Sequence, residues 1–275
     1  MAFAITESGL SPELLFLTNK FKASQFHGTR EPFAVSGIPM PIRNRDIFED
    51  FPAKLNLDVN PWVSQLIEGR RNNSLPAFYG PWLKGKKGRW KDVFVENGFS
   101  TEGPAKIVLE IGVHKGKTLI EMAEAFPEYG FVGLDITFKR VVATALKARE
   151  RNLNNVISVL ADARFMDQLF ATNELAGSLV FFPDPWLKKK SQRHNRLLNE
   201  GFIKELRQFI EDDGFFWFKT DAEDYFNEVS DILGRNKFLP HDRPEPLLTG
   251  NYQSVFELMF EGKELPTHSG AWKKL

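Results

Sequence analysis

The sequence predicts a doubly wound α/β fold with a mostly parallel sheet. From residue 106 onward, short apolar runs alternate with segments in which apolar residues recur every three or four positions. The short runs are typical of strands that are buried on both faces, and the longer spacing is typical of amphipathic helices. Strands that alternate with helices are joined by right-handed crossovers, which make neighbouring strands parallel.

The elements follow one another in a regular order. Strands are expected at residues 107–112, 131–136, 156–161, 179–182 and 215–219. Helices are expected where apolar stripes occur: Leu119, Met122, Ala123 and Phe126; Val141, Val142, Ala145 and Ala148; Leu198, Phe202, Leu206 and Phe209; and Tyr225, Val229, Ile232 and Leu233. Residues 254–260 alternate like a strand, so a late antiparallel strand is expected there.

The first hundred residues carry no long periodic pattern. Prolines interrupt this part of the chain at positions 32, 39, 41, 52, 61, 76 and 81. One short helix is expected from Asn60 to Arg70, with Trp62, Leu66 and Ile67 on one face. We therefore expect an N-terminal extension, residues 1–100, packed on a core domain of residues 101–275.

Composition excludes several classes of protein. The 275-residue chain has no cysteine, which rules out disulfides, thiolate metal sites and cysteine nucleophiles. No stretch approaches the roughly 18 apolar residues of a membrane helix, and residues 1–21 lack the order of a secretory signal. His114, His194 and His241 are scattered without ligand spacing, so no metal is expected. A cytoplasmic protein with no membrane partner is expected, as a monomer or a homodimer.

Charge is balanced overall but unevenly distributed. The 36 basic and 36 acidic side chains give zero net charge, which argues mildly against nucleic-acid binding. Basic residues nevertheless cluster at residues 84–89 and 188–196. Each cluster alone is typical of a solvated face, but two of them, one beside a candidate active site, favour an RNA partner.

The stretch 180–190 combines a buried strand end with a carboxylate, an indole and three lysines. Asp184 lies between two prolines, which present it on a stiff backbone. Ligands of open α/β sheets bind just beyond the carboxyl ends of the strands, where Asp184 and Trp186 are expected. This set suits a nucleobase on a phosphodiester chain. The alternative is a strand-ending turn followed by a solvated basic helix start.

The first strand-to-helix turn indicates a nucleoside ligand. Gly112 and Gly116 allow close approach of a ligand to the backbone. Asp135, nineteen positions after Gly116, is placed to hydrogen-bond both hydroxyls of an adenosine ribose, and Asp162 is placed for the adenine edge. Glu110 suits an ammonium group. Because G-x-G-x-x-G is missing and an acid precedes the first glycine, the pattern suits a phosphate-free zwitterion such as S-adenosylmethionine.

Each of these acids, taken singly, is more typical of a loop residue or a helix cap. Glu110, Asp135, Asp162 and Asp184, however, stand at four successive strand ends. Together they favour a ligand site.

These motifs together resemble a known family. Its pattern is matched by Leu109-Glu110-Ile111-Gly112, Gly133-Leu134-Asp135, Asp162-Ala163, Phe182-Pro183-Asp184-Pro185-Trp186 and Thr220-Asp221. The chain is similar in these residues to the bacterial tRNA (guanine-N7)-methyltransferases, over roughly residues 106–261. The resemblance implies a Rossmann-like class I methyltransferase sheet and transfer of a methyl group from S-adenosylmethionine to N7 of guanosine 46 in the tRNA variable loop.

The resemblance also implies roles for individual residues. Glu110, Asp135, Asp162 and Asp184, with the turn of Gly112 and Gly116, are expected to contact the methyl donor. Lys188 and Asp221 are expected to contact tRNA, followed by Thr249, Tyr252 and Gln253.

The chain departs from the family pattern in three places. His114 replaces the second glycine of the turn, where the methionine part of the donor lies in the family. The C-terminal Thr-x-aromatic-Glu motif is matched only loosely by residues 249–253, and the first hundred residues match poorly. These departures indicate a divergent member.

The expected chemistry is an in-line methyl displacement. N7 of guanine carries a lone pair at neutral pH, so catalysis should come from positioning and from carboxylates near the developing charge. Asp184 is the candidate catalytic residue, and Trp186 is expected to pack under the loop. Five cations are expected to grip phosphates: Lys188, Lys189, Lys190, Arg193 and Arg196.

Three alternatives remain open at this stage. A methyltransferase for another RNA, a protein or a small molecule would use similar loops. A nicotinamide-dependent oxidoreductase would need a third glycine and a catalytic dyad, neither of which the sequence shows. A catalytically silent relative would bind tRNA without the donor.

Overall fold

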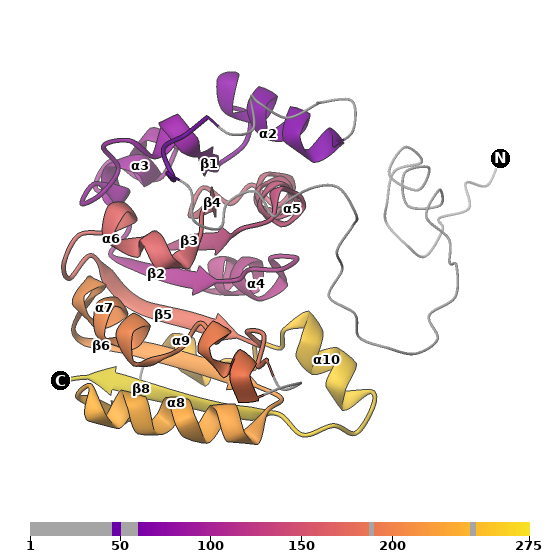
Figure 1. The fold of residues 1–275 in the computed structure, drawn as a ribbon. Coiled ribbons are helices and arrows are strands. Elements are labelled where there is room, and N and C mark those ends of the chain that lie inside the picture. The colour runs from indigo at the N-terminus through magenta and orange to yellow at the C-terminus, as the bar shows by residue number, and fades with distance from the viewer. Residues whose placement is uncertain (1–45, 51–59, 187–189, 243–245) are drawn as a thin grey trace. The chain divides into compact units, whose positions relative to one another are not determined.

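A computed structural model describes residues 46–50, 60–186, 190–242 and 246–275. The described residues form an eight-stranded sheet in the order β1-β4-β3-β2-β5-β6-β8-β7 (Figure 1). The strands are β1 (Ala77–Tyr79), β2 (Lys106–Ile111), β3 (Tyr129–Asp135), β4 (Val156–Leu160), β5 (Leu175–Phe181), β6 (Ile210–Thr220), β7 (Phe238–Pro240) and β8 (His268–Lys274).

Pairing in the sheet is parallel from β1 to β6. β2 pairs with β3 on one side and β5 on the other, β3 pairs with β4, and β5 pairs with β6. β8 then runs antiparallel to both β6 and β7. The predicted doubly wound sheet, mostly parallel with a late antiparallel strand, is therefore confirmed.

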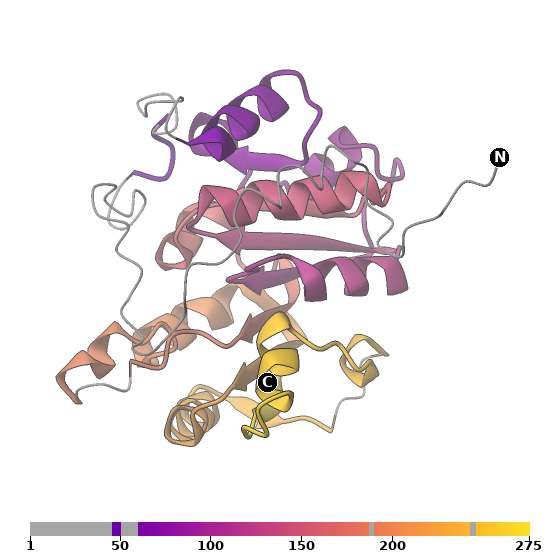
Figure 2. The same ribbon diagram turned by 90° about the vertical axis from the view of Figure 1, so that its right-hand side faces the viewer.

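Helices cover both faces of the sheet. They are α2 (Pro61–Arg71), α3 (Trp90–Glu96), α4 (Lys117–Ala125), α5 (Phe138–Glu150), α6 (Met166–Leu169), α7 (Glu200–Phe209), α8 (Glu223–Arg235), α9 (Pro246–Thr249) and α10 (Val255–Glu261), with 3-10 turns η2 (Gly80–Leu83), η3 (Ala163–Phe165) and η4 (Lys190–Asn195). Figures 1 and 2 show α4 and α5 on one side of the central strands and α6 and α7 on the other.

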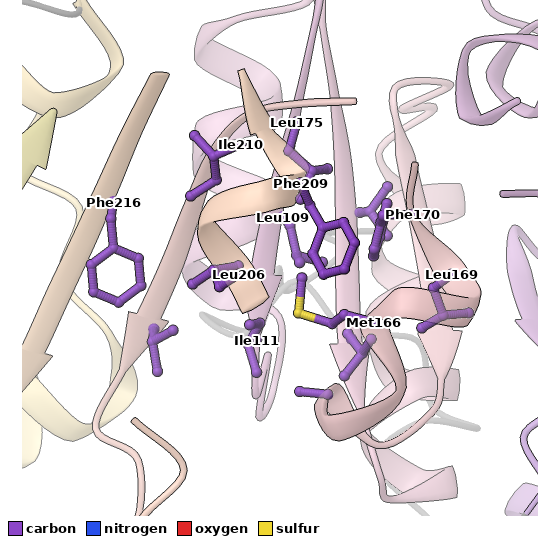
Figure 3. Packing of buried hydrophobic residues seen from close by; sticks show 14 of the residues in the cluster. Leu109, Ile111, Met166, Leu169, Phe170, Leu175, Leu206, Phe209, Ile210 and Phe216 are labelled. Carbon is purple, nitrogen blue, oxygen red and sulfur yellow. The ribbon is translucent and has the colours of Figure 1, made fainter. Parts of the chain in front are cut away.

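The two faces of β2 explain this layering. Leu109 and Ile111 pack in one core with Met166 of α6 and Leu206 of α7 (Figure 3). Val108 points the other way, into a second core with Leu119 of α4. Successive side chains of a strand alternate between its faces, so Glu110 lies on the side of Val108.

The expected strand at residues 254–260 is wrong. Residues 255–261 form α10, and the late antiparallel strand is β8. The Ser254 hydroxyl accepts a hydrogen bond from the Glu257 N–H at 3.1 Å, and the Glu257 carboxylate accepts one from the Ser254 N–H at 2.8 Å. This capping box satisfies the first N–H groups of a helix, and it decides the local structure against the weak alternation of the sequence.

Part of the first hundred residues joins the sheet. β1 pairs in parallel with β4, and the expected short helix is present as α2. Val63 and Leu66 of α2 pack against Val141 of α5, which ties this segment to the central domain. Residues 1–45 and 51–59 lie outside the described part, so a domain boundary near residue 100 stays a prediction.

Candidate active site

The carboxyl ends of the parallel strands bring the predicted acids to one edge of the sheet. Asp135 is the last residue of β3, and Asp162 and Asp184 follow the ends of β4 and β5. Glu110 is the penultimate residue of β2 and is paired in register with Gly133 of β3. Because β4, β3, β2 and β5 are neighbours, the four acids stand in the order of these strands along the edge.

Glu110 is a buried acid whose local environment favours its neutral form. The residue is 4% exposed, and its Oε2 atom has no hydrogen-bond partner among the described residues. Burial, together with the neighbouring Asp135, raises the pKa of Glu110 to about 8, against an opposing effect of Lys219. Such an orphaned oxygen is a natural acceptor for a cationic ligand group.

Asp135 organises the loop after β3 and the turn after β2. Its carboxylate accepts hydrogen bonds from the N–H groups of Thr137 at 2.9 Å and His114 at 3.3 Å, and it pairs with Arg140 at 3.4 Å. Burial raises the pKa of Asp135 although these donors oppose the shift. Glu110 and Asp135 thus stand as two buried acids on the neighbouring strands β2 and β3, at the centre of the edge.

The two glycines of the turn have different surroundings. Gly112 has φ +83°, and a side chain added there would meet no atom within 4 Å. Gly116 has φ +67°, and an added Cβ would lie 2.6 Å from the Thr144 hydroxyl of α5. Open space for a ligand therefore lies at Gly112, whereas Gly116 lets α4 begin close to α5. A ligand contact of Gly116 stays a prediction.

Asp162 begins the short turn after β4. Its side chain is 7% exposed and accepts hydrogen bonds from the Arg164 N–H at 3.0 Å and from the Arg164 guanidinium. The carboxylate is thus already held in place by its own loop, and the predicted contact with adenine remains a prediction.

The loop after β5 presents Asp184 to solvent. Asp184 is exposed, and its Oδ1 accepts a hydrogen bond from the Trp186 N–H at 3.1 Å. Phe182 and Trp186, which bracket the loop, have φ +52° and +48°, values that bulky residues rarely adopt. Backbone strain of this kind is concentrated at functional sites.

Five cations of the basic run were expected to grip phosphates, and one expectation is wrong. The Arg196 side chain is 1% exposed and pairs with Asp224 at 3.1 Å and with Glu228, so phosphates cannot reach it. Arg193 is about half exposed and also pairs with Asp224, at 2.8 Å. Lys188 and Lys189, and the side chain of Lys190, lie outside the described residues.

The predicted substrate residues lie on two further segments of the same region. Asp221 follows β6 and is partly exposed. Thr249 ends α9, and Tyr252 and Gln253 lead from it into α10. Their contact with tRNA stays a prediction.

A buried lysine fixes this last segment to the sheet. Lys219 of β6 is 5% exposed, and its Nζ donates to the Tyr252 carbonyl at 2.8 Å and to both Glu257 oxygens at 2.8 and 3.0 Å. The Lys117 Nζ donates to the Gln253 carbonyl at 2.9 Å. The start of α10 is therefore anchored beside the glycine turn.

α10 closes the space in front of the glycine turn. A small cavity of about 20 Å³ lies there, lined by Glu110, Gly112, His114 and Phe256 among others. The His114 ring lies against the Phe256 ring, with 4.8 Å between centroids. His114 has φ +50°, and burial with nearby cations lowers its pKa to about 4, so the ring is neutral near pH 7.

The sequence patterns considered above did not identify Ser254, Phe256 and Glu257 as site residues. Ser254, Phe256 and Glu257 fit the Thr-x-aromatic-Glu spacing with serine in place of threonine, more closely than residues 249–253 do. The signal was the Ser-x-x-Glu sequence of a capping box, which marks a helix start.

In the parts of the chain that the structure describes, no three metal-ligating side chains gather, and no helix is long and apolar enough to cross a membrane. The edge itself presents buried carboxylates, aromatic rings and the open space at Gly112.

Known proteins match the region that carries this site. A family model described as "Putative methyltransferase" matches residues 104–262. A bifunctional glycosyltransferase/methyltransferase of Fusobacterium nucleatum is 32% identical over 151 residues, which make up 55% of this chain and 22% of the relative. A tRNA (guanine-N(7)-)-methyltransferase of Christiangramia forsetii is 36% identical over 137 residues, 50% of this chain and 58% of the relative.

A longer match is found with another relative. The tRNA (guanine-N(7)-)-methyltransferase of Rubrobacter xylanophilus is 33% identical over 156 residues, 56% of this chain and 70% of the relative. The chain thus spans less than two thirds of the first two relatives and more than two thirds of this one. The chain belongs to this methyltransferase family, together with the tRNA (guanine-N(7)-)-methyltransferases that match it.

Proposed function

We propose that this protein transfers a methyl group from S-adenosylmethionine to N7 of a guanosine in tRNA, at variable-loop position 46. The observation that carries the proposal is the row of four acids at the edge formed by β4, β3, β2 and β5, within the region that the family model matches. The named activity of the matching relatives supports the same reaction and the same substrate class.

The residues at the glycine turn fit such a donor. The orphaned Oε2 of Glu110 would accept the ammonium group, and Gly112 leaves open space where the backbone meets the ligand. Asp135, at the end of β3, would receive the ribose hydroxyls. S-adenosylmethionine supplies a methyl group on a positively charged sulfur, which suits an edge lined by carboxylates.

Binding of the donor requires movement of the segment around Phe256, which closes the space in front of the glycine turn. Sites for ligands of this size usually enclose about 300–1,000 Å³, whereas the cavity holds about 20 Å³. Phe256 is only partly buried and lies on His114, so rotation of these two rings, with a shift of α10, would open the space. Donor binding would thus be coupled to movement of the substrate side of the site.

The chain's part in the reaction is to position and to stabilise charge. Guanine N7 attacks with its own lone pair, the carbon–sulfur bond breaks as the new nitrogen–carbon bond forms, and no base has to remove a proton first. Asp184, exposed on a stiff loop, would orient the guanine and stabilise the positive charge that develops on it.

Methyl transfer to tRNA is the direct test. With labelled S-adenosylmethionine and an unmodified tRNA transcript, we expect label in 7-methylguanosine after digestion to nucleosides. A matched transcript with adenosine at position 46 should take up no label. Label in any other nucleoside, or equal label in both transcripts, would contradict the proposed substrate.

Asp184→Ala should lower turnover severely without loss of RNA binding. Loss of one preorganised charge-stabilising group typically lowers kcat by about 100- to 1,000-fold. Because Asp184 is exposed, the fold should survive the change. Steady-state kinetics and filter binding of tRNA would measure the two effects, with Asp231→Ala, an exposed acid of α8, as the matched control. Unchanged turnover in Asp184→Ala would exclude the catalytic role.

Glu110 should make the stability of the ligand-free protein depend on pH. Its pKa is raised from 4.5 to about 8, so between these values the folded protein holds a proton that the unfolded chain has released. The free energy of unfolding should therefore fall with rising pH, by on the order of 1 kcal/mol per pH unit, and level off above pH 8.

Glu110→Gln should remove this contribution and flatten the profile. Urea unfolding at pH 5.5, 6.5 and 7.5 would compare the two proteins, and parallel profiles would show that Glu110 ionises normally.

His114→Gly should strengthen binding of the donor. The change removes the ring that lies on Phe256 and suits the positive φ of this position. In the unchanged protein, donor binding has to break this ring contact, at a cost of about 1 kcal/mol. The variant lacks the contact, so its Kd for the donor should be roughly fivefold lower. Asn152→Gly, at an exposed residue with φ +55°, is a control for the backbone effect alone. Calorimetry with S-adenosylmethionine would decide, and an unchanged Kd would show that the ring does not obstruct the ligand.

A further inference from the structure

The peptide unit between Pro185 and Trp186 is held at both ends. Its N–H, from Trp186, donates to Oδ1 of Asp184 at 3.1 Å. Its carbonyl, from Pro185, accepts a hydrogen bond from Nε of Arg196 at 2.9 Å. The orientation of this one peptide therefore links the Arg196 guanidinium to the Asp184 carboxylate.

This peptide needs such a restraint because the loop is strained. Phe182 and Trp186 both adopt positive φ, which bulky side chains disfavour. Phe182 is held by the hydrogen bond from its N–H to the Lys219 carbonyl at 2.8 Å and by the ring of Phe260 at 5.5 Å. At the other end of the loop, the contacts of the peptide with Arg196 and Asp184 maintain the conformation of Trp186.

Arg196 is itself a rigid anchor. Its guanidinium pairs with Asp224 at 3.1 Å and with Glu228, both on α8, and lies 4.5 Å above the Tyr225 ring. The Tyr225 hydroxyl in turn accepts a hydrogen bond from the Leu198 N–H at 3.0 Å. The planar fork of an arginine makes three directed contacts at once, a geometry that lysine does not reproduce.

We propose that Arg196 is a positioning residue, which sets the orientation of Asp184 by holding the Pro185 carbonyl. The inference rests on the proposed function of Asp184 in methyl transfer. Arg196 touches neither substrate nor donor, since its side chain is 1% exposed. The contact that matters is the one from Nε, and the two carboxylates serve to hold the guanidinium in place.

Two substitutions distinguish the effect of the hydrogen bond from Nε to the Pro185 carbonyl from the effect of the positive charge of Arg196. Arg196→Lys keeps a cation but places a methylene where Nε was, so the donor to Pro185 is lost. Arg196→Gln removes the charge but places an amide nitrogen at the position of Nε, so the donor is kept. Asp224 and Glu228 are about 40% exposed, and water can solvate them in either variant.

We expect Arg196→Gln to retain a higher kcat than Arg196→Lys. Misplacement of a reacting group typically costs up to about 100-fold, so Arg196→Lys should lower kcat by about 10- to 100-fold with little change in KM for tRNA or donor. Arg196→Gln should stay within about fivefold of the unchanged protein. A purely electrostatic or structural role predicts the opposite order, and that order would overturn the proposal.

Control variants show whether the effect acts through Asp184. Arg235→Lys alters an exposed guanidinium that joins α8 to Glu200 at 2.7 Å and should leave kcat unchanged. Glu228→Gln keeps an oxygen that accepts a hydrogen bond from the Arg196 guanidinium and leaves the Nε contact in place, so kcat should change by less than about twofold. In an Asp184→Asn background, Arg196→Lys should cause no further loss, because coupled residues are not additive. A further loss as large as in the unchanged protein would overturn the proposal.

A spectroscopic measurement separates this inference from the proposed function. In protein labelled with ¹⁵N at the tryptophan backbone nitrogen, the amide of Trp186 is one of six backbone signals and can be assigned with Trp186→Phe. Arg196→Lys should shift this signal and Arg196→Gln should leave it near its place. If the unchanged protein methylates no tRNA, the proposed function fails while this test still decides the inference. An unshifted signal in Arg196→Lys contradicts the inference.

Discussion

Parallel pairing of β4, β3, β2 and β5 is the constraint on which the candidate site depends. It brings the ends of four strands that are far apart in the sequence to one edge of the sheet, and each end carries an acid. Buried apolar residues on both faces hold these strands in register, so the acids are placed by the core itself. Two of the buried acids differ in their partners: Asp135 pairs with Arg140, whereas Oε2 of Glu110 has no hydrogen-bond partner among the described residues.

Two buried ionisable side chains, Glu110 and Lys219, then affect the site in opposite ways. Glu110 keeps an oxygen without a partner, and its raised pKa reflects this. Lys219 of β6, in contrast, donates hydrogen bonds to the Glu257 carboxylate and to the Tyr252 carbonyl. These bonds tie α10 to the sheet. The Glu110 carboxyl is therefore available to a ligand, while Lys219 fixes the segment that closes the space in front of the glycine turn. The small cavity between Glu110 and the start of α10 follows from this arrangement.

The loop that carries Asp184 is held by a different device. Two aromatic residues with positive φ bracket it, and a buried arginine outside the loop maintains its last peptide. Arg196 lies eleven positions further along the chain, in the run that reads as a phosphate-binding cluster. A cation with a structural partner and a cation exposed to solvent are alike in a sequence, and only burial distinguishes them.

Periodicity alone determined the fold class and placed the carboxyl ends of β2, β3, β4, β5 and β6 to within one residue, because apolar spacing reports directly which faces are buried. The same pattern predicted a common edge for Glu110, Asp135, Asp162 and Asp184, because the carboxyl ends of parallel strands lie at one edge of the sheet. Contacts between distant segments remained beyond it. The Lys219–Glu257 pair, the contact of His114 with Phe256 and the burial of Arg196 depend on which segments pack together, and no local pattern encodes that. The helix at residues 255–261 does have a local signal, the capping box of Ser254 and Glu257, which outweighs the weak alternation of the sequence there.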